Sequence, residues 1–217
     1  MIRVAKNVVV PPSLLVVGNT KHNHQDVQKQ LIEDHNEKCY VCERKCVTDY
    51  EIEHLLSTFN NPGLSTEWNN LFLSCRYCNG KKLHLFDNIL NPSLHNIEEI
   101  IQCNHLAASK SVSFESSGLQ TPQVDETIRF LDRIFNGTGK MRVIKEERFY
   151  EYYLSRIVHF QSVIDKYIST KSDLDKNIVI EELEIKQEFL AFKYHILKQR
   201  KDLFEEFALY MVWNKVI

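Results

Sequence analysis

Two Cys-x-x-Cys pairs constrain this chain more than any other feature of its sequence: Cys39 with Cys42, and Cys75 with Cys78. A thiolate pair at this spacing places both sulfurs on one tight turn, about 2.3 Å from a shared Zn²⁺. Two such turns complete a closed tetrahedral site, which stabilises the fold and leaves no position for water. Four unrelated buried thiols are the alternative, and the paired spacing argues against it. The sequence therefore predicts a structural zinc site on these cysteines.

The other two cysteines, Cys46 and Cys103, have no partner at such spacing. Cys46 is near enough to the first pair to be a spare ligand, but a plain thiol is the favoured interpretation of both. Knuckle-type spacing indicates metal ligation in a reducing compartment rather than disulfides. Pro11 and Pro12 split the apolar N-terminal run, and no small-residue cleavage site follows it. We therefore expect no signal peptide and a cytoplasmic location.

The composition is that of a soluble globular protein with one or two domains. The 217 residues are 43% hydrophobic and 26% charged, which are ordinary shares. No run approaches the roughly 18 apolar residues of a membrane span, so we expect no membrane association. The net charge of −2 is low for a protein that binds nucleic acid alone, because phosphate contacts need a basic surplus.

A second set of polar residues lies between and beside the cysteine pairs. Glu53 and His54 end one strand-like stretch, and Asn70 opens another that leads into the second pair. Asn79 directly follows that pair, where the sequence can start a helix. Strand, loop, strand and helix, with His, Asn and Asn at these places, resemble the HNH nucleases, whose ββα-metal unit is often clasped by a Cys₄ zinc.

This resemblance covers about residues 36 to 92 and implies a role for each polar residue. In the family the histidine of the first strand is the general base, and His54 matches it; neutral imidazole can take a proton from water near pH 7. Glu53 and Asn79 match the positions that hold a catalytic Mg²⁺ or Mn²⁺, which prefers such oxygen donors. Asn70 matches the middle asparagine, which braces the loop and orients the base. An isolated histidine would be interpreted as a core residue, but these matching offsets argue against that.

Two details depart from the common pattern, and both leave the substrate preference open. The glycine that often follows Asn-x-x-Lys is absent after Lys82, and Leu55-Leu56-Ser57 replaces the usual basic residue and proline after the base. Cations gather at the knuckles and after Asn79, where a phosphate backbone would lie. The DNA contacts that we expect are Arg44, Lys45, Arg76, Lys81 and Lys82.

Further segments resemble the HNH subunit of Septu-type anti-phage systems and retron-associated HNH proteins. They are the Pro-Pro arm, Cys39 to Glu43, Glu51 to His54, Glu67 to Leu71, and Leu90-Asn91-Pro92. In Septu systems the nuclease works with an ABC-type ATPase, and such a partner would compensate for the modest charge.

Three segments are expected along the chain: an arm and short helix over 1–35, the nuclease domain with zinc knuckles over 36–96, and a helical domain over 97–217. In the first segment, His22 and His24 are expected to be solvated. In the last, apolar periodicity predicts helices over 97–108, 127–135, 141–169 and 174–213, with a loop or short strand pair around Val112 and Phe114. We expect these helices to pack as an antiparallel bundle, with surplus aromatic surface for a protein partner. The predicted fold class is α+β, mainly α.

Three functions remain open. The leading hypothesis is a metal-dependent HNH DNA endonuclease in phage defence, with an ATPase partner. A non-catalytic zinc-stabilised assembly module is the second, but it would not need Glu53, His54 and Asn79 together. The third is a stand-alone restriction or homing-type HNH nuclease, which would need a sequence-reading surface that the sequence does not reveal.

Overall fold

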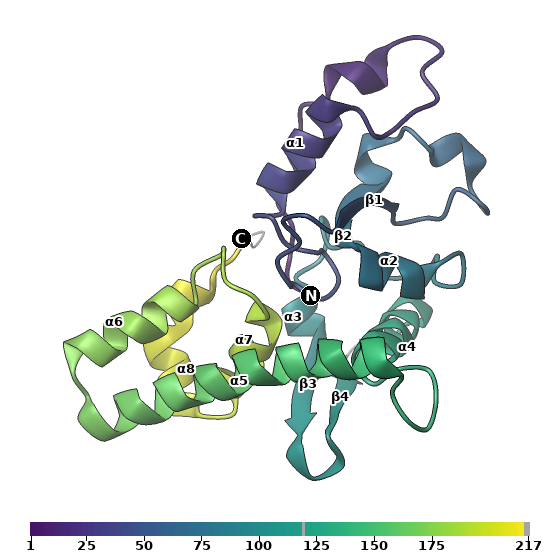
Figure 1. Cartoon of the computed structure of the whole chain (residues 1–217). Helices are drawn as coiled ribbons and strands as arrows, with labels where there is room; N and C mark the ends of the chain where they lie inside the picture. Colours follow the sequence, from purple (N-terminus) through teal and green to yellow (C-terminus); the bar gives the residue numbers. More distant parts are fainter. Residues whose placement is uncertain (119, 215–217) are drawn as a thin grey trace.

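The computed structural model describes residues 1–118 and 120–214, which are mainly helical with two small antiparallel sheets (Figure 1). The predicted class, α+β and mainly α, is confirmed. After a 3₁₀ turn, η1 (Pro12–Leu15), and helix α1 (Gln25–Asp34), the first sheet pairs β1 (Tyr50–His54) with β2 (Leu71–Cys75). Helix α2 (Arg76–Lys82) follows β2 at once. The second Cys-x-x-Cys pair therefore lies at the start of this helix, which begins three residues before Asn79.

The ββα unit forms because β2 is apolar on both faces and is buried along its whole length. Helix α1 covers one side of it through Leu31 and His35. Trp68, in the short turn η3 (Trp68–Asn70) before β2, is buried and donates its indole N–H to the carbonyl oxygen of Asn7 (2.8 Å). The structure thus confirms the core interpretation of Trp68. In the β1–β2 loop a 3₁₀ turn, η2 (Pro62–Leu64), follows the expected Asn-Pro-Gly signal.

The segment after residue 96 differs from the expected helix. Helix α3 (Ile97–Ile100) gives way to strand β3 (Ile101–Leu106), which pairs through η4 (Ala107–Ser109) with β4 (Ser111–Ser116). The helix prediction over 97–108 is therefore wrong beyond Ile100, because Ile101 and Cys103 are buried alternately with exposed Gln102, a period of two. A strand around Val112 and Phe114 is confirmed, but it pairs with β3, in the segment expected to be helical.

The helical half contains five longer helices in the described residues: α4 (Pro122–Phe135), α5 (Ile144–Thr170), α6 (Asp173–Glu182), α7 (Leu190–Lys198) and α8 (Lys201–Phe207). The expected helix over 174–213 is divided into the last three and a 3₁₀ turn, η5 (Ala208–Met211). The break between α6 and α7 ends at Phe189. Its backbone is left-handed (φ +55°) and its ring is fully buried. The apolar periodicity misled the prediction because the connecting turn is itself part of the core.

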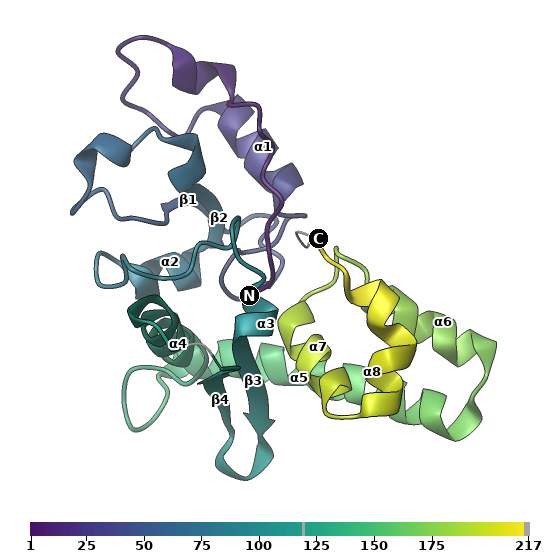
Figure 2. The ribbon, with the colours of Figure 1, turned by 180° about the vertical axis from the view of Figure 1, so that it is seen from behind.

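Helix α5 joins the two halves of the molecule. At one end it packs against α6 and α7, and at the other it contacts α4 (Figure 2). Tyr77 of α2 stacks on Phe149 of α5 (4.6 Å between ring centroids) and donates its hydroxyl to the Ile134 carbonyl oxygen (2.8 Å). One apolar cluster consequently extends from the cysteines to Phe192, across the boundary expected at residue 96. No helix in the described parts of the chain is long and apolar enough to cross a membrane.

Candidate functional site

The four predicted metal ligands come together beside the first sheet. Cys39, Cys42, Cys75 and Cys78 are all buried, and their sulfurs lie within 4.8 Å of one another. Cys42 Sγ and Cys75 Sγ are 3.9 Å apart, close to the roughly 3.8 Å that 2.3 Å bonds in a tetrahedron would give. The donor set and its geometry thus fit a closed metal site, and this is the only His/Cys/Asp/Glu cluster of its kind in residues 1–118 and 120–214.

The two remaining cysteines lie outside this cluster. Cys46 is buried and donates its thiol to the Glu37 carbonyl oxygen (3.5 Å). Cys103 is buried and donates to the Ala191 carbonyl oxygen (3.7 Å). Burial raises the pKa of both thiols well above the ordinary value, which favours the neutral form. Both therefore act as plain buried thiols.

The first knuckle is anchored to the helical half by Glu43. Its backbone N–H bonds to the Cys39 carbonyl oxygen (2.9 Å), which closes the turn. Its buried carboxylate accepts the N–H groups of Leu190 (2.7 Å) and Ala191 (3.2 Å) at the start of α7 and pairs with the Met1 ammonium (3.0 Å). The metal site and the helical half are thus directly connected.

His54, at the end of β1, is held by one ring nitrogen. Nε2 lies 2.9 Å from the Ser65 carbonyl oxygen. A carbonyl oxygen only accepts, so Nε2 carries the proton and Nδ1 keeps a lone pair. Burial lowers the pKa of His54 below its ordinary value; the bond to Ser65 opposes this, and the cation of Lys82 adds to it. The ring is therefore neutral at pH 7 and can accept a proton at Nδ1.

Asn70 closes the loop that supplies the Ser65 carbonyl. Its side-chain amide donates to the carbonyl oxygens of Leu56 (3.0 Å) and Leu64 (3.2 Å), and its Oδ1 accepts the Leu56 N–H (2.7 Å). These bonds join the beginning and the end of the β1–β2 loop. Asn70 thus fixes the residue next to Ser65, and through it the ring of His54.

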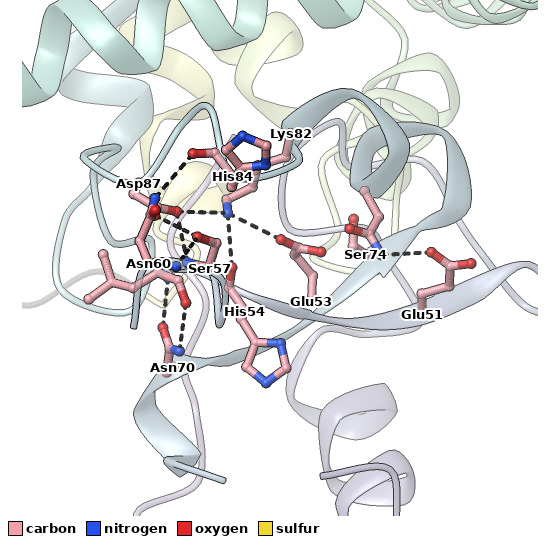
Figure 3. A network of polar contacts seen from close by, with 12 residues as sticks. Glu51, Glu53, His54, Ser57, Asn60, Asn70, Ser74, Lys82, His84 and Asp87 are labelled. Atoms are coloured by element: carbon pink, nitrogen blue, oxygen red, sulfur yellow. Dashed lines mark hydrogen bonds and ion pairs between the residues drawn. The ribbon is translucent and has the colours of Figure 1, made fainter. Parts of the chain in front are cut away.

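Glu53 and His54 point to opposite faces of β1 (Figure 3), as successive strand residues do. Glu53 faces α2, where its Oε1 lies 3.1 Å from the Lys82 ammonium. Lys82 is fully buried and also donates to the His54 carbonyl oxygen (2.9 Å). Burial raises the pKa of Glu53 to about 7, although the Lys82 cation acts in the opposite direction. The Lys82 ammonium thus occupies and compensates the carboxylate of Glu53, which is the residue expected to bind the catalytic metal.

Lys82 also connects this carboxylate to Asp87, which the sequence did not single out. Asp87 Oδ1 lies 3.8 Å from the Lys82 ammonium, and the carboxylate accepts the N–H (2.7 Å) and hydroxyl (2.6 Å) of Ser57 (Figure 3). The network fixes the chain just after β1 to the turn that follows α2. Only the folded chain brings Ser57 and Asp87 together.

Asn79 does not contact Glu53 but donates its amide to Glu51 Oε2 (2.7 Å). Glu51, Asn79, Arg76 and Lys145 line an open cavity of about 500 Å³. Carboxylate and amide oxygens on one side of β1 and α2 are the right donors for a hard divalent ion. The donor types fit, but Glu53 must leave Lys82 before it can bind an ion, whereas Asn79 engages Glu51 through its amide nitrogen and keeps Oδ1 for a metal.

The expected DNA contacts separate into exposed and internal cations. Arg76 is 83% exposed in its side chain, and Lys45 is exposed. By contrast, Arg44 is paired with Asp49 and Lys81 with buried Glu146. Lys82 is enclosed between β1 and α2, so its ammonium does not reach solvent in this structure. Arg76 and Lys45 are the members of this set whose side chains are exposed to a phosphate backbone, although Arg76 Nε also lies 3.7 Å from Glu51 Oε1.

His22, expected to be solvated, lies against His54 instead. Their ring centroids are 4.5 Å apart and the ring planes cross at 78°. No periodicity or spacing in the sequence marks this contact, because His22 lies in a polar segment far from His54 along the chain.

Comparison with known proteins supports the same site. Residues 39–84 match the HNH endonuclease family, and the match includes both cysteine pairs, Glu53, His54, Asn70 and Asn79. This segment is an HNH endonuclease domain. The chain is also 37% identical over 68 residues to the Septu protein PtuB of Bacillus thuringiensis. That alignment covers 30% of this chain and 26% of PtuB. The chain is thus similar to PtuB over about a quarter of that relative's length.

Proposed function

We propose that this chain is a metal-dependent DNA endonuclease, the nuclease effector of a Septu-type anti-phage complex. The observation that carries the proposal is the fixed orientation of His54 within an HNH domain: Nε2–H is bonded to Ser65 and Nδ1 is available to accept a proton.

In this reaction His54 removes a proton from water through Nδ1, and the resulting hydroxide attacks the scissile phosphate of DNA. The bond from Nε2 to Ser65 keeps the ring oriented and stabilises the charge that the imidazole acquires. Asn70 keeps the Ser65 carbonyl in place through Leu56 and Leu64. His54 is thus the general base and Asn70 its positioning residue.

Glu53, once released from Lys82, and Asn79, through its Oδ1, would hold the catalytic Mg²⁺ or Mn²⁺. Such an ion would supply stabilisation of the charge that develops on the phosphate and the leaving oxygen. The four cysteines would hold a structural Zn²⁺, because a buried Cys₄ set prefers zinc. A reducing cytoplasm keeps such thiolates available.

An ABC-type ATPase of the PtuA kind is the proposed partner. The net charge is −2, and several expected phosphate contacts are engaged inside the protein, so DNA binding alone should be weak. The helical half carries apolar side chains on its surface, among them Leu174 (70% exposed) and Leu209 (86% exposed). We propose that the ATPase docks on this half and supplies part of the DNA-binding surface.

The two other hypotheses are less well supported. A zinc-stabilised assembly module gives no reason for a neutral His54 with a free Nδ1. A stand-alone restriction or homing nuclease would need its own DNA-reading surface, and the exposed cations of the expected contact set, Arg76 and Lys45, with Lys145 beside the cavity, are too few for that.

The test is plasmid cleavage in Mg²⁺ by the purified chain, with and without its ATPase partner. We expect nicking or cleavage that the partner increases and that His54→Ala abolishes. Equal cleavage without the partner would favour the stand-alone nuclease. No cleavage under either condition, by protein with its full metal content, would favour the assembly module.

A further inference from the structure

The N-terminal arm places a second imidazole at the nuclease site. We propose that His22 is a positioning residue for His54, so that the catalytic site includes a segment outside the HNH match at residues 39–84. The inference rests on the proposed function, in which His54 is the base. It adds a residue to which nothing in the HNH pattern assigns a role.

The contact between the two rings has a defined geometry. The rings meet edge to face, with centroids 4.5 Å apart and planes at 78°, an arrangement that aromatic rings prefer. His22 is about half-buried. Burial lowers the pKa of His22, and the neighbouring His54 lowers it further. The uncharged form of His22 is therefore favoured, which suits its packing against the His54 ring.

The segment that carries His22 is fixed by Asn19. Asn19 Oδ1 accepts the Lys21 N–H (2.9 Å) and lies 3.2 Å from His24 Nε2. The Asn19 amide donates to the carbonyl oxygens of Ser13 (3.0 Å) and Lys21 (2.8 Å). Gly18 precedes it with φ +80°, a conformation that favours glycine. His22 is thus presented by a closed turn.

The arm is in turn tied to the nuclease domain. Ser13 bonds to Asp26 of α1 through its N–H (2.9 Å) and its hydroxyl (2.7 Å). Nearer the start of the chain, the Lys6 ammonium donates to the Leu71 carbonyl oxygen of β2 (2.7 Å) and lies over the Trp68 ring (4.0 Å to the centroid). These contacts place the arm on the same sheet that bears His54.

The two contacts of His54 constrain different motions. The bond to Ser65 fixes one nitrogen but allows the ring to turn about that bond. The His22 ring packs against the imidazole and limits this rotation, so Nδ1 keeps one direction. A base displaced by about 1 Å can lose on the order of 10²-fold in rate, so the second contact has a kinetic consequence.

The kinetic test compares three variants, assayed as full chain with the ATPase partner in Mg²⁺. His22→Ala should lower kcat about 10-fold to 10²-fold with little change in KM, because DNA binding is not affected. His22→Phe keeps the ring contact and should restore most of the rate. Asn23→Ala, an exposed neighbour in the same segment, is the matched control and should behave as wild type. Wild-type kcat in His22→Ala, or an equal loss in His22→Phe, would overturn the proposal.

A spectroscopic test separates this proposal from the proposed function, because it needs no activity. In the wild-type chain, imidazole ring protons of His22 and His54 should show a mutual NOE. The ¹⁵N shifts should report the Nε2–H tautomer for His54. In His22→Ala that tautomer should persist, because the bond to Ser65 is retained, but the His54 ring should become more mobile, which ¹³C relaxation of its ring carbons measures; in His22→Phe the ring should stay as rigid as in the wild type. Absence of the NOE, or an unchanged mobility of the His54 ring in His22→Ala, would overturn the positioning role even if the enzyme cleaves DNA. If the NMR results hold and no cleavage occurs, only the proposed function fails.

Discussion

The ammonium of Lys82 lies 3.1 Å from Glu53 Oε1, with no part of the lysine exposed to solvent. The pair occupies the side of β1 where an HNH nuclease is expected to hold its catalytic metal. The lysine keeps the buried carboxylate compensated when no divalent ion is bound. Metal binding by Glu53 therefore requires the lysine to give up this contact.

Replacement of this lysine should cost stability. We expect Lys82→Met to lower the free energy of unfolding by about 3–5 kcal/mol, because it leaves Glu53 and Asp87 without their buried cation. Urea unfolding of the zinc-loaded protein measures the change. Arg76→Met, at an 83% exposed side chain, is the control and should change stability by no more than about 0.5 kcal/mol. A stability loss in Lys82→Met as small as that of the control would show that the pair is not structural.

For DNA affinity we expect the reverse order of the same two variants: Arg76→Met should have an effect and Lys82→Met should not. Arg76→Met should weaken DNA binding and reduce the slope of log affinity against log salt by about 1, because one phosphate contact is lost. Lys82→Met, where folded, should leave that slope unchanged. Fluorescence anisotropy with a labelled duplex at several salt concentrations measures both. A salt slope that drops for Lys82→Met instead would place this lysine on the DNA.

Loss of one metal ligand should prevent folding. We expect one tightly held Zn²⁺ per chain on Cys39, Cys42, Cys75 and Cys78, and Cys75→Ser should yield insoluble or unfolded protein because metal binding and folding are coupled. Elemental analysis and circular dichroism measure these properties. Cys46→Ser, at a buried thiol outside the cluster, is the control and should retain the zinc. Folded wild-type protein without zinc would disprove the prediction.

Removal of the general base should abolish the reaction without unfolding the protein. His54→Ala should lower the cleavage rate by ~10²–10⁴-fold, while the zinc content stays unchanged because the cysteines lie elsewhere. Glu53→Ala and Asn79→Ala should act through the catalytic ion, so raised Mn²⁺ should partly restore them but not His54→Ala. Cleavage rates against metal concentration distinguish the two kinds of defect. Full cleavage by folded His54→Ala would show that another residue is the base.

Acid should weaken the contact between α1 and β2. His35 Nδ1 donates to the Leu31 carbonyl oxygen (2.8 Å), and its Nε2 accepts the Leu73 N–H (3.3 Å). Burial, with a smaller effect from the Lys6 cation, lowers the pKa of His35 to about 3. The unfolded chain is protonated near pH 6.5, so between these values it binds more protons than the folded chain, and stability falls as the pH falls.

A variant that lacks only His35 isolates this effect. His35→Gln should be less stable at pH 7, yet its stability should fall less steeply with acid, by up to about 1.4 kcal/mol per pH unit. Urea unfolding between pH 7.5 and 5.5, with zinc content checked at each pH, measures both slopes. Parallel slopes would mean that His35 has the same pKa in the folded and unfolded chain, which would contradict the lowered pKa.

The sequence predicts those parts of the site whose chemistry requires residues at a fixed spacing along the chain. The cysteine pairs can be recognised because each occupies one turn, and the loop-bracing place of Asn70 was implied by the resemblance to HNH nucleases. Lys82 lies inside the protein, although a lysine after a knuckle usually faces solvent. Its burial depends on Glu53 and Asp87, which only the folded chain brings to it.

The secondary structure was misjudged where tertiary burial overrides local pattern. The apolar residues of β3 can be placed on a short helix as well as on a strand, and pairing with β4 decides for the strand. The α6–α7 break carries no glycine or proline. A buried Phe189 in a left-handed conformation makes that turn instead.

The anchoring of the first knuckle by Glu43 also has a consequence for protein engineering. Homologous recombination or cassette exchange limited to residues 39–84 would transfer a carboxylate that needs the amides of Leu190 and Ala191 to be satisfied. Functional chimeras should therefore be confined to exchanges that keep the knuckle and the start of α7 from one parent, and these two regions should vary together among natural relatives.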